Sequence, residues 1–190
     1  MAEGKLFYVI GPSGSGKDSL MRYGRERLAG NVGVVFAHRY ITRPVDLNGE
    51  NHVVLSDVEF DARLAAGLFA MHWESHGLRY GIGREINFWM AKGCNVVMNG
   101  SREYLAEARH AYPALMPILV TVSPDILRAR LHARGRESDA QITQRLLRAE
   151  QFKCLGGYME TILNDGELDE AGEHFVTLLS AVRLPTRAEA

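Results

Sequence analysis

A glycine-rich stretch near the start of the chain has the residue types and spacing that bind polyphosphate. Its residues are Gly11, Pro12, Ser13, Gly14, Ser15, Gly16 and Lys17. Glycines let consecutive backbone amides turn inward on an anion, and Lys17 adds a full positive charge. The apolar run 6–10 precedes the stretch and a predicted helix starting near Ser19 follows it, which is the context of a P-loop. We therefore predict a nucleoside triphosphate site at 11–19, in preference to an ordinary Gly/Ser turn.

Asp18 replaces the hydroxyl residue that ordinarily follows the lysine of this motif. That Ser or Thr normally contacts Mg²⁺, and a carboxylate can also hold Mg²⁺, directly or through water. Ser19 is no substitute, because at about 3.6 residues per turn the next helical position faces another direction. We therefore predict Mg²⁺ as a cofactor and Asp18 as the residue on its side of the loop.

The composition fits one globular domain and excludes several classes of protein. The 190 residues are 46% hydrophobic and 24% charged, with a formal net charge of −1, and a chain of this length can bury a substantial core. The small net charge argues against a general nucleic-acid or membrane-surface binder. Cys94 and Cys154 match no zinc or redox spacing, and the N-terminus has too few apolar residues for a signal peptide. We expect a cytoplasmic protein, either a monomer or a homodimer.

Apolar runs that alternate with helical patterns predict an α/β fold, in which a mostly parallel sheet is covered on both faces. Strands are predicted at 6–10, 32–37, 52–55, 94–99, 115–122 and 162–163. Helices are predicted from near 19, and at 56–67, 84–92, 101–110, 124–134, 139–152 and 168–181. Ser56 and Glu59 form a capping box at the start of the second helix. A small hairpin, 69–73 with 78–81, interrupts the alternation, and 43–51 is predicted to be a loop.

Four separated segments resemble the guanylate kinase group of P-loop nucleoside monophosphate kinases. They are 11–17, Thr42-Arg43-Pro44, Leu78-Arg79-Tyr80-Gly81, and 130–135 together with Arg145-Leu146. The resemblance covers essentially the whole chain and implies a three-layer P-loop NTPase fold. It also implies three parts: a core of 1–37, 84–128 and 154–190, a small acceptor-binding β insertion at about 38–83, and a helical arginine lid at about 129–153.

The resemblance breaks where members that act on GMP place acidic groups against the guanine edge. Met71 stands at one of these positions, and Asn99 or Ser101 at the other. An acid-to-Met exchange removes the acceptor that a guanine N–H needs, and an unpaired buried polar edge costs about 1–3 kcal/mol. We therefore expect GMP to bind poorly.

A narrower resemblance is to the ribose 1,5-bisphosphate phosphokinases, the PhnN family. It rests on the segments 16–19, 37–43, 50–52 and 99–102. Members of that family use ATP to phosphorylate ribose 1,5-bisphosphate to 5-phospho-α-D-ribose 1-diphosphate, with release of ADP, in bacterial phosphonate breakdown. The resemblance implies this reaction, ATP and Mg²⁺ as cofactors, a small sugar phosphate as substrate, and no nucleic-acid or membrane partner.

The resemblance also implies roles for individual residues. Lys17 and the loop amides hold the β- and γ-phosphates, and Arg130, Arg134 and Arg145 close over the transferring group as a lid. A solvated helix face is the alternative for Arg130. The residues expected to bind the acceptor are Arg39, Thr42, Arg43, His52, Tyr80, Asn99 and Ser101. Among these, the two arginines grip phosphates, whereas Asn99 and Ser101 meet ribose hydroxyls.

In this reaction the acceptor is a phosphate group. Its second pKa of about 6 leaves it ionised at neutral pH, so no catalytic base is required.

The roles of some other residues stay open at this point. Asn164-Asp165 is expected either beside the adenine or in a plain Asx turn. Trp73 is expected in the core.

Other functions also stay open. The nearest alternative is a nucleoside monophosphate kinase that acts on GMP. A second alternative is a non-catalytic guanylate kinase-like protein-binding module, which the intact Gly16-Lys17 loop and the lid arginines argue against. A third is an ATPase or switch that hydrolyses ATP without an acceptor.

Overall fold

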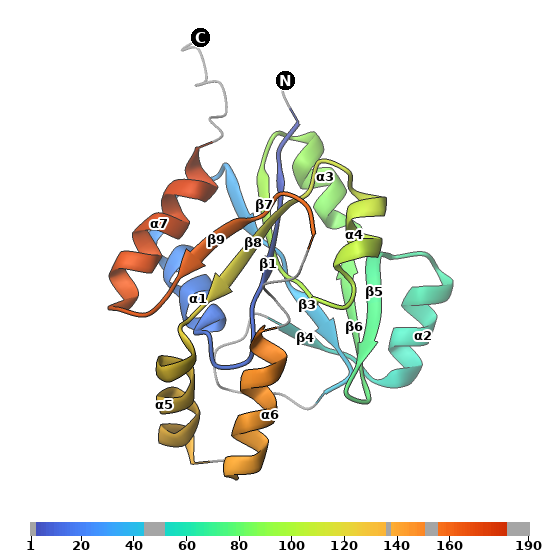
Figure 1. Ribbon diagram of the computed structural model, residues 1–190. Coiled ribbons are helices and arrows are strands. Elements are labelled where there is room, and N and C mark those ends of the chain that lie inside the picture. Colours follow the sequence, from blue (N-terminus) through green and yellow to red (C-terminus); the bar gives the residue numbers. More distant parts are fainter. Residues whose placement is uncertain (1–2, 44–51, 136–137, 151–155, 182–190) are drawn as a thin grey trace.

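A five-stranded sheet of parallel strands lies at the centre of the computed structural model, which describes residues 3–43, 52–135, 138–150 and 156–181 (Figure 1). Its strands, in spatial order, are β2 (Val34–Phe36), β7 (Asn95–Asn99), β1 (Leu6–Ile10), β8 (Met116–Thr121) and β9 (Glu160–Leu163). Strand β1 is buried along its whole length. This is the pattern expected of a parallel strand covered on both faces.

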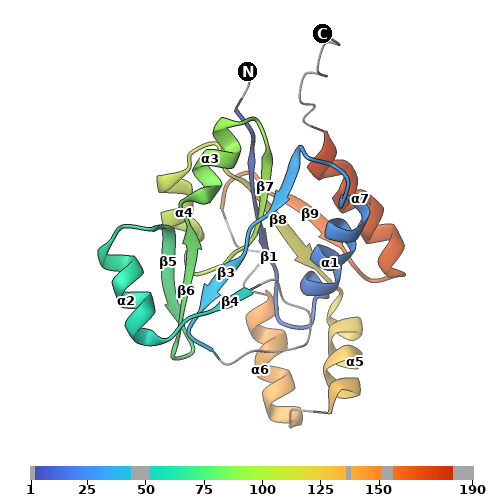
Figure 2. The ribbon, with the colours of Figure 1, turned by 180° about the vertical axis from the view of Figure 1, so that it is seen from behind.

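Helices cover both faces of this sheet (Figures 1 and 2). Successive residues of β1 pack against opposite layers. Phe7 packs with α1 and α7, whereas Tyr8 packs with α3 and α4. The predicted three-layer α/β fold is therefore confirmed. The helices are α1 (Lys17–Arg27), α2 (Asp57–Ala65), α3 (Glu85–Ala91), α4 (Leu105–Ala111), α5 (Pro124–Arg134), α6 (Asp139–Glu150) and α7 (Leu168–Ser180).

Helices α5 and α6 lie side by side beyond the end of the sheet at which α1 begins (Figures 1 and 2). They share a small apolar cluster, in which Leu131 and Ile142 are each 2% exposed. The pair thus has its own contacts and is separate from the main core. No helix in the described ranges is long and apolar enough to cross a membrane.

A second sheet is mixed and has four strands, with α2 packed on it. In spatial order its strands are β4 (His52–Val54), β3 (Arg39–Ile41), β6 (Leu78–Gly83) and β5 (Phe69–Ser75). Phe60 of α2 contacts Phe69 of β5, with ring centroids 4.7 Å apart. The predicted hairpin of β5 and β6 is confirmed, but β3 was not predicted. A three-residue strand with a charged first residue carries little periodicity, and its pairing with β4 and β6 is what defines it.

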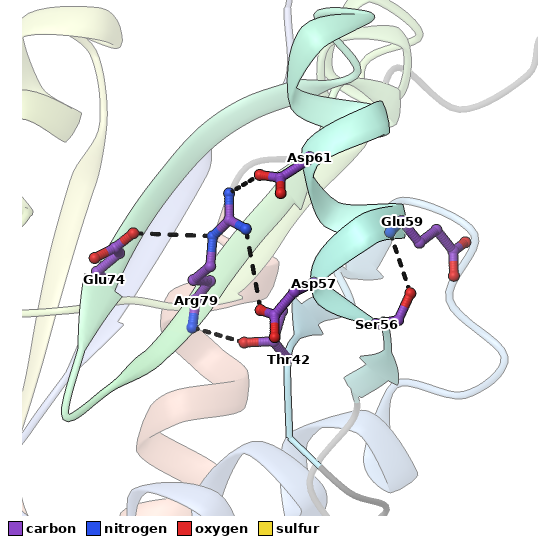
Figure 3. A network of polar contacts seen from close by, with 7 residues as sticks. All are labelled: Thr42, Ser56, Asp57, Glu59, Asp61, Glu74 and Arg79. Atoms are coloured by element: carbon purple, nitrogen blue, oxygen red, sulfur yellow. Dashed lines mark hydrogen bonds and ion pairs between the residues drawn. The ribbon is translucent and has the colours of Figure 1, made fainter.

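Ser56 is the N-cap of α2 as predicted, because its Oγ accepts a hydrogen bond from the Glu59 amide at 3.1 Å (Figure 3). This is one half of the predicted capping box, and the Glu59 carboxylate accepts instead from Arg63 at 2.8 Å. Helix α4 begins at Leu105, so the prediction that it starts at Ser101 was wrong by four residues. The backbone of Ser101 is instead bound to the hydroxyl of Tyr8. The predicted loop residues 44–51 and the predicted end of the helix at 151–152 lie outside the described residues.

Candidate active site

The phosphate loop joins β1 to α1 with the strained backbone that its glycines permit. Gly14 and Gly16 have φ angles of 97° and 82°, which L side chains rarely adopt. The Ser15 amide donates to the Pro12 carbonyl at 3.1 Å and closes the turn. Helix α1 begins directly after its N-cap Gly16, which brings no side chain to its first amides. Those amides can therefore bind an anion, so the loop fits a nucleotide polyphosphate.

Asn164 directly follows β9 and holds the phosphate loop in place through its side chain. It is 3% exposed, and its Nδ2 donates to the Ser15 carbonyl at 2.7 Å. A β-carbon on Gly16 would clash with that same nitrogen. Asp165, in contrast, accepts from the Ser123 amide at 2.7 Å. Asn164 therefore holds the phosphate loop and Asp165 ties the end of β9 to the start of α5, and neither contact decides between a place beside the adenine and an Asx turn.

A cavity of about 380 Å³ lies above the phosphate loop and brings most of the predicted site together. The predicted residues on its wall are Gly11, Pro12, Ser13, Gly14, Gly16, Lys17, Asp18, Ser19, Arg39, Tyr80, Asn99, Ser101 and Arg134. The wall also contains residues to which the sequence assigned no role: Trp73, Ser75, Gly100, Arg102 and Glu103. One space thus joins the loop, the mixed sheet and the end of β7.

Lys17, Asp18 and Asn99 form a closed triangle of polar contacts on this wall. Lys17 Nζ lies 2.6 Å from Asn99 Oδ1 and 3.2 Å from Asp18 Oδ1. Asn99 Nδ2 donates to the same oxygen of Asp18 at 3.3 Å. Burial lowers the pKa of Lys17, and the charge of Lys17 lowers the pKa of the Asp18 carboxyl. Asn99, expected to meet a ribose hydroxyl, contacts these two side chains in this structure.

The carboxylate of Asp18 fits the requirements of Mg²⁺. The ion prefers oxygen ligands and is usually held by one or two carboxylates together with substrate phosphates. Asp18 has a side chain that is 65% exposed and lies beside the phosphate loop. No cluster of three or more His, Cys, Asp or Glu in the described ranges could hold a metal by itself.

Arg39 and Tyr80 form the side of the cavity that belongs to the mixed sheet. The Arg39 guanidinium lies 5.2 Å from the centroid of the Tyr80 ring, and Tyr80 stacks on Trp73 with centroids 5.5 Å apart. Burial lowers the pKa of Arg39 to about 10, so the side chain keeps its charge at neutral pH. Trp73 is 8% exposed, as the core prediction requires, yet it also borders the cavity. This side therefore presents a buried cation held by an aromatic stack.

Ser101 is fixed by Tyr8, a residue that the sequence analysis missed. The Tyr8 hydroxyl donates to the Ser101 carbonyl and accepts from the Ser101 amide, both at 2.9 Å. Burial raises the pKa of Tyr8, so its proton stays in place for this contact. A tyrosine inside an apolar strand gives no local signal of such a role.

Glu103 places an acidic group at the edge of the cavity that was also not anticipated. Ser101 Oγ and Arg102 each donate to its carboxylate at 3.0 Å. Burial opposes ionisation of this carboxyl, but hydrogen bonds from its own amide, Ser101 and Arg102 leave its pKa lowered. The group is therefore an anion at neutral pH, and it is the second carboxylate on a cavity wall that also contains Asp18.

Three of the residues predicted to bind the acceptor, and Met71, lie away from the main cavity wall. Thr42 Oγ1 accepts from the Arg79 amide at 3.0 Å, within the mixed sheet (Figure 3). His52 is on β4, and Arg43 follows β3. Met71 is 1% exposed and lies within the core, so its side chain is not accessible to a ligand in this structure.

The lid arginines face three different spaces. Arg134 borders both the main cavity and a neighbouring cavity of about 300 Å³, which Arg130 and Asn164 also line. Arg145 lines a wider space of about 710 Å³, together with Arg148 and the tip of the phosphate loop. Only Arg134 therefore reaches the space above Lys17 among these three.

Comparison with known proteins gives a consistent result. A protein of Thiobacillus denitrificans named ribose 1,5-bisphosphate phosphokinase PhnN is 71% identical over 99% of both chains. Relatives of the same name from Desulfomicrobium baculatum and Psychromonas ingrahamii are 55% and 53% identical, over 92% and 94% of this chain and 94% and 91% of theirs. No family model matches the chain. A solved guanylate kinase from Anaplasma phagocytophilum aligns with a TM-score of 0.69 at 16% identity, over 97% of this chain and 89% of its own, and this likeness supports the fold alone.

Proposed function

Because the chain belongs to the ribose 1,5-bisphosphate phosphokinase PhnN family, we propose that it transfers the γ-phosphoryl group of ATP to ribose 1,5-bisphosphate. The products are 5-phospho-α-D-ribose 1-diphosphate and ADP, and the reaction belongs to phosphonate catabolism. The observation that carries the proposal is the single cavity in which the phosphate loop faces Arg39, Tyr80 and Ser101. That cavity offers cations and hydroxyls to an anionic acceptor.

The reaction needs positioning and charge neutralisation more than proton transfer. An oxygen of the C1 phosphate attacks the γ-phosphorus, and the bond from that phosphorus to the β–γ bridging oxygen breaks as ADP leaves. The acceptor oxygen is already ionised at neutral pH, so no base has to remove a proton. The mutual repulsion of the two anionic substrates is the main obstacle, and Lys17 and Arg39 reduce it from opposite sides. Mg²⁺, when bound with ATP, neutralises charge on the β- and γ-phosphates beside Asp18.

We assign the remaining roles by where each residue lies. Arg134 reaches the transferring phosphoryl group, because it borders the main cavity and the neighbouring one. Arg130 and Arg145 approach from the adjoining spaces when the α5–α6 pair closes. Thr42, Arg43 and His52 approach the acceptor from the mixed sheet, and Ser101 bonds a ribose hydroxyl.

We also propose the division into a core (1–37, 84–128 and 154–190), an acceptor-binding insertion at about 38–83 and a lid at about 129–153. The strands of the mixed sheet all fall within the insertion, and those of the parallel sheet all fall within the core. We place the enzyme in the cytoplasm, where its co-substrate ATP is made. Its partner is a small sugar phosphate and no nucleic acid.

A coupled assay of ADP release tests the proposed acceptor. Ribose 1,5-bisphosphate, GMP and AMP are offered in parallel with saturating MgATP. We expect turnover with the bisphosphate alone. Robust turnover with GMP alone would assign the chain to the nucleoside monophosphate kinases, and ADP release without any acceptor would make it an ATPase. A chain that binds no ATP by calorimetry would be a non-catalytic module.

A further inference from the structure

Two positions that hold Mg²⁺ in P-loop NTPases carry reversed chemistry in this chain. Ordinarily a Ser or Thr follows the loop lysine, and an Asp on a strand supplies the carboxylate. Here the residue after Lys17 is Asp18, and β7, the strand paired directly with β1, ends in Asn99. The site therefore keeps one carboxylate and one neutral polar side chain, but at exchanged positions.

The structure brings these two side chains into direct contact. Asn99 Nδ2 donates to Asp18 Oδ1 at 3.3 Å, while Asn99 Oδ1 accepts from Lys17 Nζ at 2.6 Å. An amide can donate and accept at once, whereas an ionised carboxylate at position 99 could only accept. Asn99 is 6% exposed and its position is fixed by β7. Asn99 thus holds the exposed carboxylate of Asp18 and the amine of Lys17 in fixed positions through its two hydrogen bonds.

We propose that Asp18 and Asn99 are an exchanged pair, in which the loop supplies the carboxylate for the metal and Asn99 is the positioning residue that orients it. Asn99 stays neutral because a second carboxylate within 3.3 Å of Asp18 would add like-charge repulsion and would hold Lys17 away from the phosphates. The inference rests on the proposed function only as far as metal and nucleotide binding, and it does not depend on the acceptor.

The test measures Mn²⁺ affinity by electron paramagnetic resonance in the presence of ADP and in the absence of any acceptor. Four proteins are compared: the unchanged chain, Asp18→Ser, Asn99→Asp, and the double variant. We expect Asp18→Ser to weaken Mn²⁺ binding at least about tenfold, which corresponds to about 1.4 kcal/mol. The double variant, with the ordinary arrangement restored, should recover most of that loss, whereas Asn99→Asp alone should gain no affinity.

The decisive comparison is between Asp18→Ser and the double variant. If the double variant binds Mn²⁺ no more tightly than Asp18→Ser, the exchange is overturned. A matched control combines Asp18→Ser with Asn31→Asp, which adds the same charge at an exposed turn beyond the C-terminal end of α1, and it should recover nothing. Recovery of Mn²⁺ affinity by this control would show that net charge alone causes the effect, and it would also overturn the proposal.

Two measurements separate this outcome from misfolding and from failure of the proposed function. Melting curves and ADP affinity in EDTA report whether each variant keeps its loop, and neither should change with Asn99→Asp in the Asp18→Ser background. Should Asn99→Asp alone fail to fold, the decisive pair still gives the answer. Since no sugar phosphate is present, a wrong acceptor assignment leaves the result untouched.

Discussion

At the scale of single residues, Tyr8 shows how a core side chain can define a binding site. Its ring lies in the main core between the sheet and the α3–α4 layer. Its hydroxyl is bonded to both the carbonyl and the amide of Ser101. The turn after β7 is therefore held by one phenolic oxygen, and the cavity wall at Ser101 depends on a residue that does not itself line the cavity.

Replacing Tyr8 by Phe should lower stability and impair acceptor binding together. The change leaves two backbone groups of Ser101 without their partner, at a cost of about 1–3 kcal/mol in the free energy of unfolding. We also expect the KM for the sugar phosphate to rise while the KM for ATP is nearly unchanged. Urea denaturation and steady-state kinetics check both effects. A normal acceptor KM would show that the turn holds its shape without the hydroxyl.

The residue scale also shows which part of the site the sequence could predict. The phosphate loop is one contiguous segment. The spacing of its glycines, Lys17 and Asp18 was therefore enough to predict its chemistry. Asn164 contacts the loop across 149 positions, and Tyr8 contacts Ser101 across 93. Partners at such separations have no spacing rule, because only the finished topology brings them together. Glu103 was missed although its partners Ser101 and Arg102 are its neighbours in sequence, because only the finished fold places this segment at the cavity.

At the scale of elements, Arg79 fastens α2 to the hairpin of β5 and β6 (Figure 3). Its guanidinium lies 2.5 Å from Asp61 and 3.8 Å from Glu74, and it covers the ring of Phe60 at 4.3 Å. Its backbone pairs twice with Thr42. The same residue thus joins the helix, the hairpin and the strand that leads to Arg43.

We expect Arg79→Gln to loosen the acceptor side of the cavity without affecting the nucleotide side. Loss of the guanidinium frees α2 from the hairpin, so the KM for the sugar phosphate should rise and the melting temperature should fall. ADP affinity, measured by calorimetry, should stay within error of the unchanged protein. Arg22→Gln, at an exposed position of α1, is the matched control and should change neither. A loss of ADP affinity in Arg79→Gln would mean that the two sides are mechanically coupled.

Contact between α1 and α7 should give the stability a pH-dependent part. Glu173 accepts from Tyr23 at 2.7 Å and from Arg27 at 2.9 Å, and these bonds lower its pKa below the ordinary value of 4.5. A lowered carboxyl pKa adds stability above the unfolded value, and this stability is lost as pH falls through the folded value. The melting temperature of Glu173→Gln should therefore lie below that of the unchanged protein at pH 7. The difference should shrink as pH falls below 4.5 and vanish once pH is below the lowered pKa of the folded state, and a constant difference would contradict the assignment.

Helices and strands differ in how well their own residues predict them. The capping box at Ser56 and the apolar run of β1 are local and were predicted. Strand β3 is not, because its three residues acquire strand geometry from β4 and β6 on either side. The start of α4 was placed too early for a related reason, since Tyr8 holds the backbone of Ser101 outside the helix.

At the scale of the whole molecule, the site lies where three bodies of structure meet: the parallel sheet, the mixed sheet and the α5–α6 pair. A ligand that bridges them must stabilise the folded state by mass action. Lys17 works against that stability in the free protein, because burial of its amine lowers its pKa and thereby disfavours the charged form that phosphate binding needs.

ADP with Mg²⁺ should therefore stabilise the unchanged protein and fail to stabilise Lys17→Ala. At 100 times the dissociation constant, the ligand adds about 2.7 kcal/mol, which raises the melting temperature by about 5–10 °C for a chain of this size. Without ligand, Lys17→Ala should melt at the same temperature or slightly higher. Differential scanning fluorimetry over an ADP series checks both statements. An equal ligand-induced rise in the variant would place the polyphosphate elsewhere.

The hydrogen bond from Asn164 to the Ser15 carbonyl has a consequence for folding during synthesis of the chain. The phosphate loop is synthesised well before Asn164, which lies 149 positions after Ser15. Until β9 has emerged, the Ser15 carbonyl lacks this hydrogen bond, and we expect the loop to bind nucleotide weakly. Nascent chains stalled before residue 160 should accordingly be retained poorly by an ATP affinity resin, so ATP should not assist folding of the loop before β9 has been synthesised.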